Sequence, residues 1–266
     1  MKLLMGSELA EYIKVRQAKA VRTLIQSKKI TPRLAIITTI DNPVIDLYVR
    51  LKQQYAEDIG IVVDVYRIDQ DKVANLVEKL NVDESVHGII IQLPLEHPEE
   101  TDKLVNLVVA KKDVDALGVN AKFDPATPNA ILWLLSGFNI NIQGKKVVLV
   151  GRGKLVGQPL ERILKNSDID VVVVDKQTKN IGEIIRLADV IITATGQPAI
   201  IKSEMVKYGA VVVDAGVASE NGKTVGDVDD ELYERLDITI TPRKGGVGPL
   251  TICALFDNVI NAASQT

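Results

Sequence analysis

The feature that most limits the fold of this chain is a series of short, β-branched, apolar runs that alternate with helical stretches. In the second half of the chain the runs are Val147–Val150, Val171–Val174, Val190–Thr193 and Val211–Asp214. Runs that are apolar on both faces suit strands of a parallel sheet covered by helices on each side. The sequence therefore predicts an α/β fold with a mainly parallel sheet.

The first half of the chain repeats this alternation. Strands are expected over 34–38, 61–65 and 88–92, and helices over 42–59 and 72–80. Asn42 and Thr127 each cap a predicted helix and are each followed by a proline, which suits the first helical position. We therefore expect two α/β domains, residues 1–120 and 121–248. Pro249 opens a last helix over 249–266, which the pattern alone assigns to neither domain.

Composition excludes several classes of protein. Of 266 residues, 46% are hydrophobic and 25% are charged, which excludes wholesale disorder. The net charge of −3 provides no basic field for nucleic acid or anionic lipid. The single cysteine, Cys253, suits a reducing compartment, and two histidines with one cysteine argue against a zinc site. No apolar run approaches the roughly 18 residues of a membrane helix, and the first residues meet charge too soon for a secretory signal. We expect a cytoplasmic protein with no metal, nucleic acid or membrane partner.

A glycine-rich loop follows the strand 147–150 and precedes a predicted helix. Its glycines are Gly151, Gly153 and Gly157, one residue wider than the usual dinucleotide fingerprint. Glycines in this position let the backbone approach a pyrophosphate, and the helix start offers free N–H groups. Asp175, at the end of the next strand, is a candidate ligand for the ribose of the cofactor. We interpret the loop as a dinucleotide site, with an ordinary tight turn as the alternative.

The charges around this loop bear on the choice of cofactor. Asp175 suits the 2′-hydroxyl of NAD, whereas Arg152 and Lys176 suit the 2′-phosphate of NADP. Because two cations outnumber one acid, NADP is favoured and NAD stays possible.

Polar residues in the first half form a second candidate group. Tyr48 and Lys52 lie one helical turn apart on one face. A lysine in a closed site can lose its proton more readily and serve in proton transfer, although most helical lysines are solvated. Gln92 ends a strand, and the carboxyl ends of parallel strands are where binding crevices form. The alternative is that its amide only hydrogen-bonds the following loop. Asp113 and Asp115 point in opposite directions if the chain is extended there, so that one could face a cleft and the other solvent; without other context, both are typical of surface charges.

These motifs, in this order, resemble the bifunctional methylenetetrahydrofolate dehydrogenase/methenyltetrahydrofolate cyclohydrolase family. They span nearly the whole chain, and their order is far more specific than any one of them. The matching stretches are Tyr48-Val-x-x-Lys52 with Gly60-Ile61; Gly88-Ile-x-x-Gln92-Leu-Pro-Leu95; Lys112-Asp-Val-Asp115; Pro125-x-Thr-Pro128; Gly151-Arg152 with Val156-Gly157-x-Pro159; Thr178-Lys-Asn180; Gly226-Asp-Val228; and Gly245-Gly-Val-Gly-Pro249 with Thr251.

The resemblance implies two α/β domains flanking a cleft, the first binding folate and the second, a Rossmann-like domain, binding NAD(P). It also implies that the last helix packs back on the first domain and that the protein is a homodimer. The implied activity is oxidation of 5,10-methylenetetrahydrofolate with a nicotinamide cofactor, then hydrolysis of the methenyl product to 10-formyltetrahydrofolate. These reactions belong to one-carbon metabolism and supply purine biosynthesis.

The resemblance also implies a role for individual residues. Lys52 transfers protons in the hydrolysis, Tyr48 packs on the folate, Gln92 hydrogen-bonds the lysine, and Asp115 accepts from the pterin ring. Further substrate-binding residues are Leu93, Gly245, Gly246 and Pro249. The expected cofactor-binding residues are Gly151, Arg152, Gly153, Val156, Gly157, Asp175, Lys176, Thr195 and Gly196.

The sequence departs from the family pattern mainly at the cofactor end. Gly153 replaces a serine, Asp175-Lys176 replaces His-Ser, and Arg243-Lys244 replaces Val-Pro; Ile45 and Ala116 replace a serine and a glycine. Three alternatives follow: a cyclohydrolase with weak or altered dehydrogenase activity, a non-catalytic folate or nucleotide binder, and another two-domain dehydrogenase. The last leaves Gln92-Leu-Pro-Leu95 and the Gly245 run unexplained.

Overall fold

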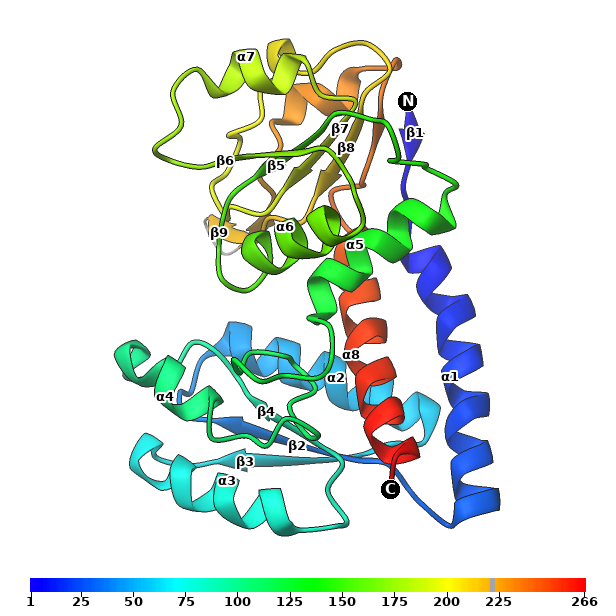
Figure 1. Cartoon of the computed structure of the whole chain (residues 1–266), viewed down its shortest axis with the longest axis vertical. Helices are drawn as coiled ribbons and strands as arrows, with labels where there is room; N and C mark the ends of the chain where they lie inside the picture. The colour runs from blue at the N-terminus through cyan, green and yellow to red at the C-terminus, as the bar shows by residue number, and fades with distance from the viewer. Residues whose placement is uncertain (221–222) are drawn as a thin grey trace. The chain divides into compact units, whose positions relative to one another are not determined.

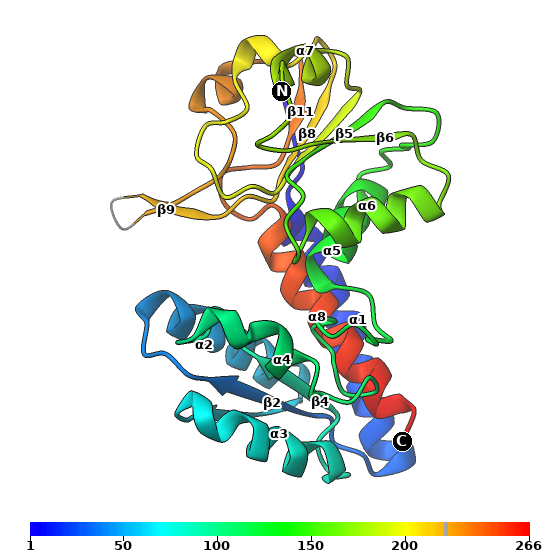
Figure 2. The same cartoon turned by 60° about the vertical axis from the view of Figure 1, so that its left-hand side comes forward.

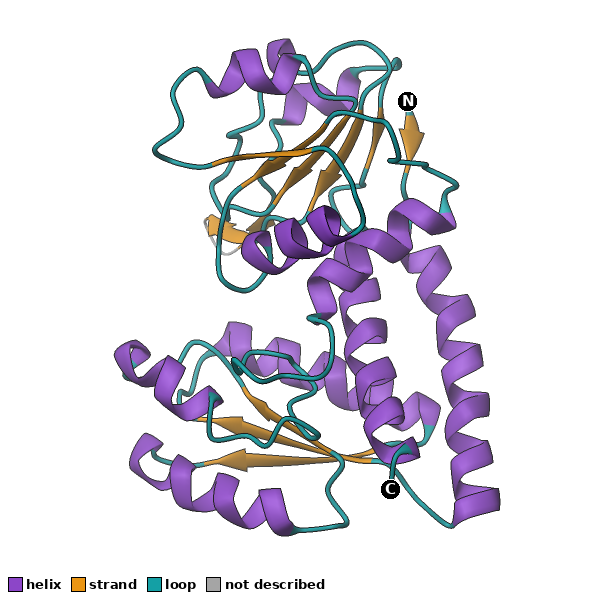
Figure 3. Ribbon diagram, viewed as in Figure 1, coloured by secondary structure: helices purple, strands orange, loops and turns teal. Residues whose placement is uncertain are grey.

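The computed structural model describes residues 1–220 and 223–266, which form two compact α/β units (Figures 1 and 3). Unit 1 comprises Met1–Ala10 and Thr127–Thr251, and unit 2 comprises Glu11–Ala126 and Ile252–Thr266. Strands within the main sheet of each unit run parallel, so the predicted fold class is confirmed.

Unit 2 is built on a three-stranded parallel sheet in the order β3-β2-β4. The strands are β2 (Arg33–Thr38), β3 (Val62–Arg67) and β4 (Gly88–Ile91). The helices around it are the main part of α1 (Gly6–Lys28), then α2 (Pro43–Ile59), α3 (Val73–Val82), α4 (Thr101–Val105) and most of α8 (Val247–Ser264), with 3-10 turns over Gln70–Lys72 and Pro98–Glu100.

Alternation along the strands supplies both faces of this sheet with apolar side chains. Ala35 and Ile37 of β2 join Val73, Val77 and Leu80 of α3 in one buried cluster, which α4 completes. The other residues of β2 point to the opposite face. Figure 2 shows α2 on that side of the sheet and α3 on the first. The sheet is therefore a buried middle layer.

Helix α2 begins and ends as the sequence predicts. The Oδ1 of Asn42 accepts a hydrogen bond from the Val44 N–H at 2.8 Å, and Pro43 occupies the first turn. Gly60 ends the helix with φ of +82°, a left-handed conformation that glycine adopts without steric cost. Between these caps the helix buries Ile45, Val49, Ala56 and Ile59.

Unit 1 is built on a six-stranded parallel sheet in the order β1-β11-β8-β7-β5-β6. The strands are β1 (Lys2–Leu3), β5 (Val147–Val150), β6 (Val171–Val174), β7 (Val190–Thr193), β8 (Val211–Asp214) and β11 (Thr239–Ile240). Its helices are α5 (Ala126–Gly137), α6 (Gly157–Asn166) and α7 (Ile181–Arg186), with 3-10 turns over Ser203–Met205 and Asp230–Glu234 and a separate hairpin of β9 (Ala218–Glu220) and β10 (Lys223–Val225).

The strand order of unit 1 reverses at β5. The next strand along the chain, β6, pairs on one side of β5, whereas β7 and β8 extend the sheet on the other side. Such a reversal is a topological switch point, and the crevice outside the carboxyl ends of the strands there is the usual ligand site of open α/β sheets. The loops that follow Val150 and Thr193 therefore flank the position that favours a bound ligand.

The first ten residues belong to unit 1, which differs from the predicted range of 1–120 for the first domain. Lys2 and Leu3 pair with Thr239 and Ile240 at the edge of the six-stranded sheet. Two-residue strands lack the apolar pattern that marks a strand in sequence. Their placement follows from long-range pairing, which the sequence pattern does not reveal.

Helix α8 is long and apolar enough to cross a membrane by length and composition, although it was not predicted as such. Its polar residues, among them Asp257 and Asn258, interrupt any continuous apolar run. Within the protein, 61% of the helix is buried. Phe256 and Val259 have no exposed surface, which is the pattern of a core helix.

Candidate catalytic and nucleotide sites

The centre of the candidate catalytic site is a hydrogen bond between α2 and the end of β4. The Lys52 Nζ donates to the Oε1 of Gln92 at 2.7 Å. The amide of Gln92 is itself fixed, because its Nε2 donates to the Leu93 carbonyl at 3.1 Å and its backbone N–H donates to the Ile37 carbonyl at 2.9 Å. Gln92 therefore presents an uncharged acceptor to the lysine in a set direction.

Burial changes the pKa values of Lys52 and Asp115 in the directions that favour the uncharged side chains. Loss of solvent lowers the pKa of Lys52 below its usual value, and the charge of Asp115 opposes this shift. Burial likewise raises the pKa of Asp115, and the charge of Lys52 opposes that shift. A lysine with a lowered pKa exchanges its proton more easily near neutral pH, which suits acid–base chemistry.

Asp115 lies on a tight segment that its neighbour Asp113 holds together. The Asp113 carboxylate accepts from the Gly118 N–H at 2.8 Å and from the Leu117 N–H at 3.3 Å. The Asn258 side chain of α8 adds a 2.9 Å hydrogen bond to the Val114 carbonyl. Ala116 has φ of +57°, the left-handed conformation in which the family usually has glycine.

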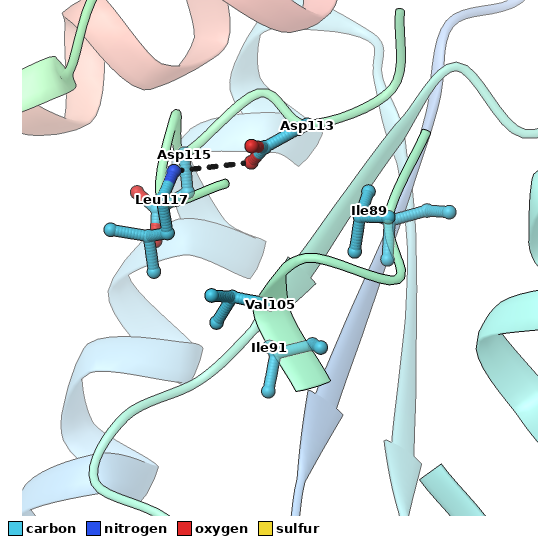
Figure 4. A pocket seen from close by; sticks show the side chains of 7 residues that line it. Ile89, Ile91, Val105, Asp113, Asp115 and Leu117 are labelled. Atoms are coloured by element: carbon cyan, nitrogen blue, oxygen red, sulfur yellow. Dashed lines mark hydrogen bonds between the residues drawn. The ribbon is translucent and has the colours of Figure 1, made fainter. Parts of the chain in front are cut away.

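Asp113 is only 3% exposed, so the expectation that one of the two acids faces solvent is wrong. Asp113 and Asp115 instead line one small pocket on the sheet of unit 2 (Figure 4). The apolar part of its wall comes from β4, α4 and the residues that follow them: Ile89, Ile91, Val105, Val108 and Leu117.

Tyr48 lies one turn before Lys52 on a face of α2 that remains exposed. Val44, Leu47 and Leu51 share this face, and Tyr48 is 38% exposed. Apolar residues at this helical spacing form a continuous stripe. The stripe offers a planar ligand an apolar and aromatic surface beside the lysine.

The glycine loop of unit 1 has the shape that the sequence predicts, a strand followed by a turn and a helix. Gly151 has φ of +103°, and a Cβ there would lie 2.8 Å from the Ala194 carbonyl oxygen. A Cβ on Gly157 would lie 2.2 Å from the Gly151 carbonyl oxygen. No atom lies within 4 Å of a Cβ at Gly153, so the glycine that replaces the family serine is not required by packing.

The start of α6 follows the glycine loop directly. Val156 caps this helix without a side-chain hydrogen bond, while the Gln158 N–H donates to the Gly153 carbonyl at 3.0 Å. A helix N-terminus of this kind after a glycine loop is the usual pyrophosphate site of dinucleotide-binding domains. The loop and helix therefore fit a nicotinamide dinucleotide.

The charged residues near this loop are partly engaged within the chain. The Arg152 Nε donates to the Oε2 of Glu161 at 3.0 Å, and Lys165 contacts the other oxygen at 2.7 Å. Both cations keep the pKa of Glu161 below its usual value. Asp175 closes its own turn, because its Oδ1 accepts from the Gln177 N–H at 2.9 Å. Lys176 is exposed.

Sequence reasoning missed three acids in unit 1. Glu161 was not identified, because a helical glutamate looks like a surface residue until its burial is known. Asp227 is also buried, and Asp214 is half-buried, beside the loops that follow β7 and β8. The stretch Gly226-Asp-Val228 was a signal for Asp227, but its partners are distant in the sequence.

The remaining predicted residues fall into the two units. Thr195 and Gly196 follow β7 in unit 1, beside the glycine loop. Gly245, Gly246 and Pro249 also belong to unit 1, whereas Leu93 belongs to unit 2 with the lysine. Within residues 1–220 and 223–266, no group of three or more His, Cys, Asp or Glu side chains is placed to hold a metal ion.

Comparison with known proteins matches both halves of the chain to one family. Residues 4–115 match the tetrahydrofolate dehydrogenase/cyclohydrolase catalytic domain, and residues 125–266 match the NAD(P)-binding domain of the same family. The chain is 37% identical to the bifunctional protein FolD of Lactobacillus helveticus over 272 residues, which cover 97% of this chain and 96% of that protein.

Solved structures give the same result. The bifunctional FolD methylenetetrahydrofolate dehydrogenase/cyclohydrolase of Campylobacter jejuni is 37% identical, with a TM-score of 0.94 and coverage of 100% and 99% of the two chains. The Trypanosoma brucei enzyme, solved with NADP and an inhibitor, is 30% identical, with a TM-score of 0.91 and coverage of 99% and 97%. The chain therefore belongs to the tetrahydrofolate dehydrogenase/cyclohydrolase family.

Proposed function

We propose that this chain oxidises 5,10-methylenetetrahydrofolate with NADP and hydrolyses the methenyl product to 10-formyltetrahydrofolate. Family membership makes it an enzyme of one-carbon folate metabolism. The observation that carries the proposal is the 2.7 Å hydrogen bond from Lys52 to Gln92, beside Asp115 and with a lowered lysine pKa. A non-catalytic folate binder would have little use for such a lysine.

We assign the proton transfers of the hydrolysis to Lys52. Water adds its oxygen to the methenyl carbon and loses a proton, which the neutral amine of Lys52 accepts. The bond between that carbon and one ring nitrogen then breaks as the added oxygen forms the formyl C=O bond and gives up its remaining proton, and the lysine ammonium returns a proton to the departing nitrogen. One proton from the water is released overall. Gln92 keeps the amine in place without the negative charge that would hold it protonated.

Asp115 and Tyr48 orient the substrate in this proposal. A carboxylate complements the amino group and ring N–H donors of a pterin, and the pocket at Asp115 is lined by apolar side chains together with Asp113. The exposed ring of Tyr48 and its apolar neighbours offer a stacking surface for the folate. Leu93 follows Gln92 directly and is assigned to the same substrate site.

We assign the nicotinamide cofactor to the loop between β5 and α6. When bound, the cofactor supplies the hydride acceptor, and the reaction needs no side-chain acid for that step. The residues that hold it are Gly151, Arg152, Gly153, Val156, Gly157, Lys176, Thr195 and Gly196, and Gly245, Gly246 and Pro249 contact substrate and nicotinamide.

The local charges support NADP over NAD. Asp175 uses one carboxylate oxygen to close its own turn, which leaves only the other oxygen for a ribose hydroxyl. Arg152 and Lys176 both follow the carboxyl ends of neighbouring parallel strands, because Val150 ends β5, Val174 ends β6, and the two residues are paired. Arg152 engages Glu161 through its Nε, which leaves the terminal nitrogens of the guanidinium to face a 2′-phosphate.

The domain roles and the cellular setting are also proposals. We assign folate binding to the first domain together with the end of the last helix, and the cofactor to the second domain. We further propose a cytoplasmic homodimer that binds neither nucleic acid nor membrane, supported by the net charge of −3 and a single cysteine. Analytical ultracentrifugation of the purified chain tests the homodimer.

The function is tested by supplying 5,10-methylenetetrahydrofolate with NADP and, in parallel, with NAD. We expect reduced nicotinamide to form faster with NADP, and 10-formyltetrahydrofolate to accumulate. Hydrolysis of supplied methenyltetrahydrofolate without any nicotinamide reduction would show that the protein is a cyclohydrolase without dehydrogenase activity. Absence of both reactions would overturn the proposal.

A further inference from the structure

Asp227 is a fully buried carboxylate that holds the loop after β7. Its Oδ2 accepts hydrogen bonds from the Thr193 hydroxyl and the Thr195 N–H, each at 2.6 Å. Its Oδ1 accepts from the Gln197 N–H at 3.0 Å. One side chain thus fixes the last residue of β7 and two backbone amides of the following turn.

Asp214, the last residue of β8, holds the segment that carries Asp227. Its Oδ1 accepts from the Gly216 N–H at 2.9 Å and from the Asp227 N–H at 3.2 Å, and its Oδ2 accepts from the Val228 N–H at 3.1 Å. The two acids therefore act in series. Asp214 holds the backbone at Asp227 in place, and the side chain of Asp227 holds the loop that contains Thr195.

Two glycines leave room for these carboxylates and for nothing larger. A Cβ on Gly216 would lie 2.0 Å from the Oδ1 of Asp227, and a Cβ on Gly226 would lie 2.1 Å from the Oδ2 of Asp214. Both distances are shorter than any non-bonded contact allows. The packing of each carboxylate against glycine backbone indicates that its position is tightly determined.

The loop that Asp227 holds packs against the glycine loop at the switch point of the sheet. A Cβ on Gly151 would lie 2.8 Å from the Ala194 carbonyl oxygen and 3.0 Å from the Thr195 side chain, so the two loops are in close contact. Asp175 follows β6, which pairs with β5 on one side, whereas this loop follows β7, which pairs with β5 on the other side. In folds of this type the dinucleotide crosses the switch point, one half on each side.

We propose that Asp227 is a positioning residue for the cofactor, and that Asp214 acts through it. By fixing the Thr195 and Gln197 amides against Gly151, Asp227 shapes the wall that receives the half of NADP opposite Asp175. This inference rests on the proposed function, because it takes the switch-point crevice as the NADP site. It assigns Asp227 no contact with the reacting atoms.

The test replaces Asp227 by asparagine and compares both activities with NADP binding. An amide nitrogen cannot accept a hydrogen bond, so at least one of the three contacts is lost. We expect calorimetry to show a Kd for NADP raised about tenfold or more, as for loss of charge-assisted hydrogen bonds. KM for NADP should rise more than kcat falls, and hydrolysis of supplied methenyltetrahydrofolate should persist.

The matched control is Asp229→Asn. Asp229 lies two residues further on, but its carboxylate pairs with Lys202 and caps the Glu231 N–H. NADP binding should be unchanged in this control. An unchanged Kd in Asp227→Asn, beside a wild-type protein that reduces NADP, would overturn the inference alone. A wild-type protein that neither binds nor reduces NADP would instead overturn the proposed function, and this inference with it.

If Asp227→Asn does not fold, Thr193→Val provides the second variant. It keeps the β-branched shape in β7 and removes only the hydroxyl that donates to Asp227. We expect the Kd for NADP to rise by roughly two- to tenfold, as for one neutral hydrogen bond. A Kd equal to that of the wild type in a folded Thr193→Val protein would contradict the proposal.

Discussion

Lys52 on α2 and Gln92, the first residue after β4, are joined by a 2.7 Å hydrogen bond between the lysine Nζ and the amide Oε1. They lie on different elements. Because β2 pairs in parallel with β4, Gln92 lies at the carboxyl end of the sheet. The neutral partner matters because a carboxylate in the same place would stabilise the lysine ammonium.

The first prediction concerns the pH dependence of the hydrolysis. The pKa of Lys52 lies below its usual value, and the neutral amine is the proton acceptor, so the rate should rise with pH through that pKa. Gln92→Glu adds a negative charge, which should shift the rise to higher pH by about one unit or more. The rate of methenyltetrahydrofolate hydrolysis against pH measures this shift. Gln54→Glu on the same helix is the control, and equal profiles for wild type and Gln92→Glu would contradict the prediction.

The second prediction concerns Ala116. Its φ of +57° costs an L-residue roughly 1–2 kcal/mol relative to glycine. Ala116→Gly should therefore raise the free energy of unfolding, by about 1 kcal/mol after the greater freedom of glycine in the unfolded chain is subtracted. Denaturant unfolding measures the change. Ala121→Gly, at a position without positive φ, should lower stability, and a loss of stability in both variants would refute the account of Ala116.

The third prediction concerns the choice of cofactor. Arg152→Ala should raise the Kd for NADP by about tenfold or more, because a charge-assisted contact to the 2′-phosphate is lost, and should change the Kd for NAD much less. Titration calorimetry with each nucleotide gives the comparison. Arg162→Ala, an exposed position on α6, is the control. Equal losses for NADP and NAD would show that Arg152 does not read the 2′-phosphate.

Much of the fold follows from local sequence. The runs at 147–150, 171–174, 190–193 and 211–214 are strands with those same bounds, because each begins with at least three consecutive apolar residues, nearly all of them β-branched. Asn42-Pro43 and Gly60 set the ends of α2 for equally local reasons. The edge strand β1 and its neighbour β11 escape such reasoning, since two residues carry no periodicity and pairing alone defines them.

The residues of the candidate sites also differ in whether local sequence predicts them. Gly151 and Gly157 are readable in sequence, because a turn between a strand and a helix demands glycine at fixed positions. Tyr48 and Lys52 share a helix, but the approach of Gln92 depends on sheet pairing and was suggested by family resemblance. Glu161 is a buried partner of two cations, and Asp227 is a buried acceptor for backbone amides distant in the sequence. Neither property is visible in a linear pattern.

In the proposed reaction, Lys52 transfers protons in the hydrolysis but not in the hydride step. Lys52→Met keeps most of the unbranched side chain and removes the amine. We predict that hydrolysis of methenyltetrahydrofolate falls by about 10²–10⁴-fold, the usual contribution of a general acid–base group, while NADP reduction is largely retained. Lys79→Met, on the exposed face of α3, should leave both activities unchanged. Hydrolysis at the wild-type rate in Lys52→Met would contradict the claim.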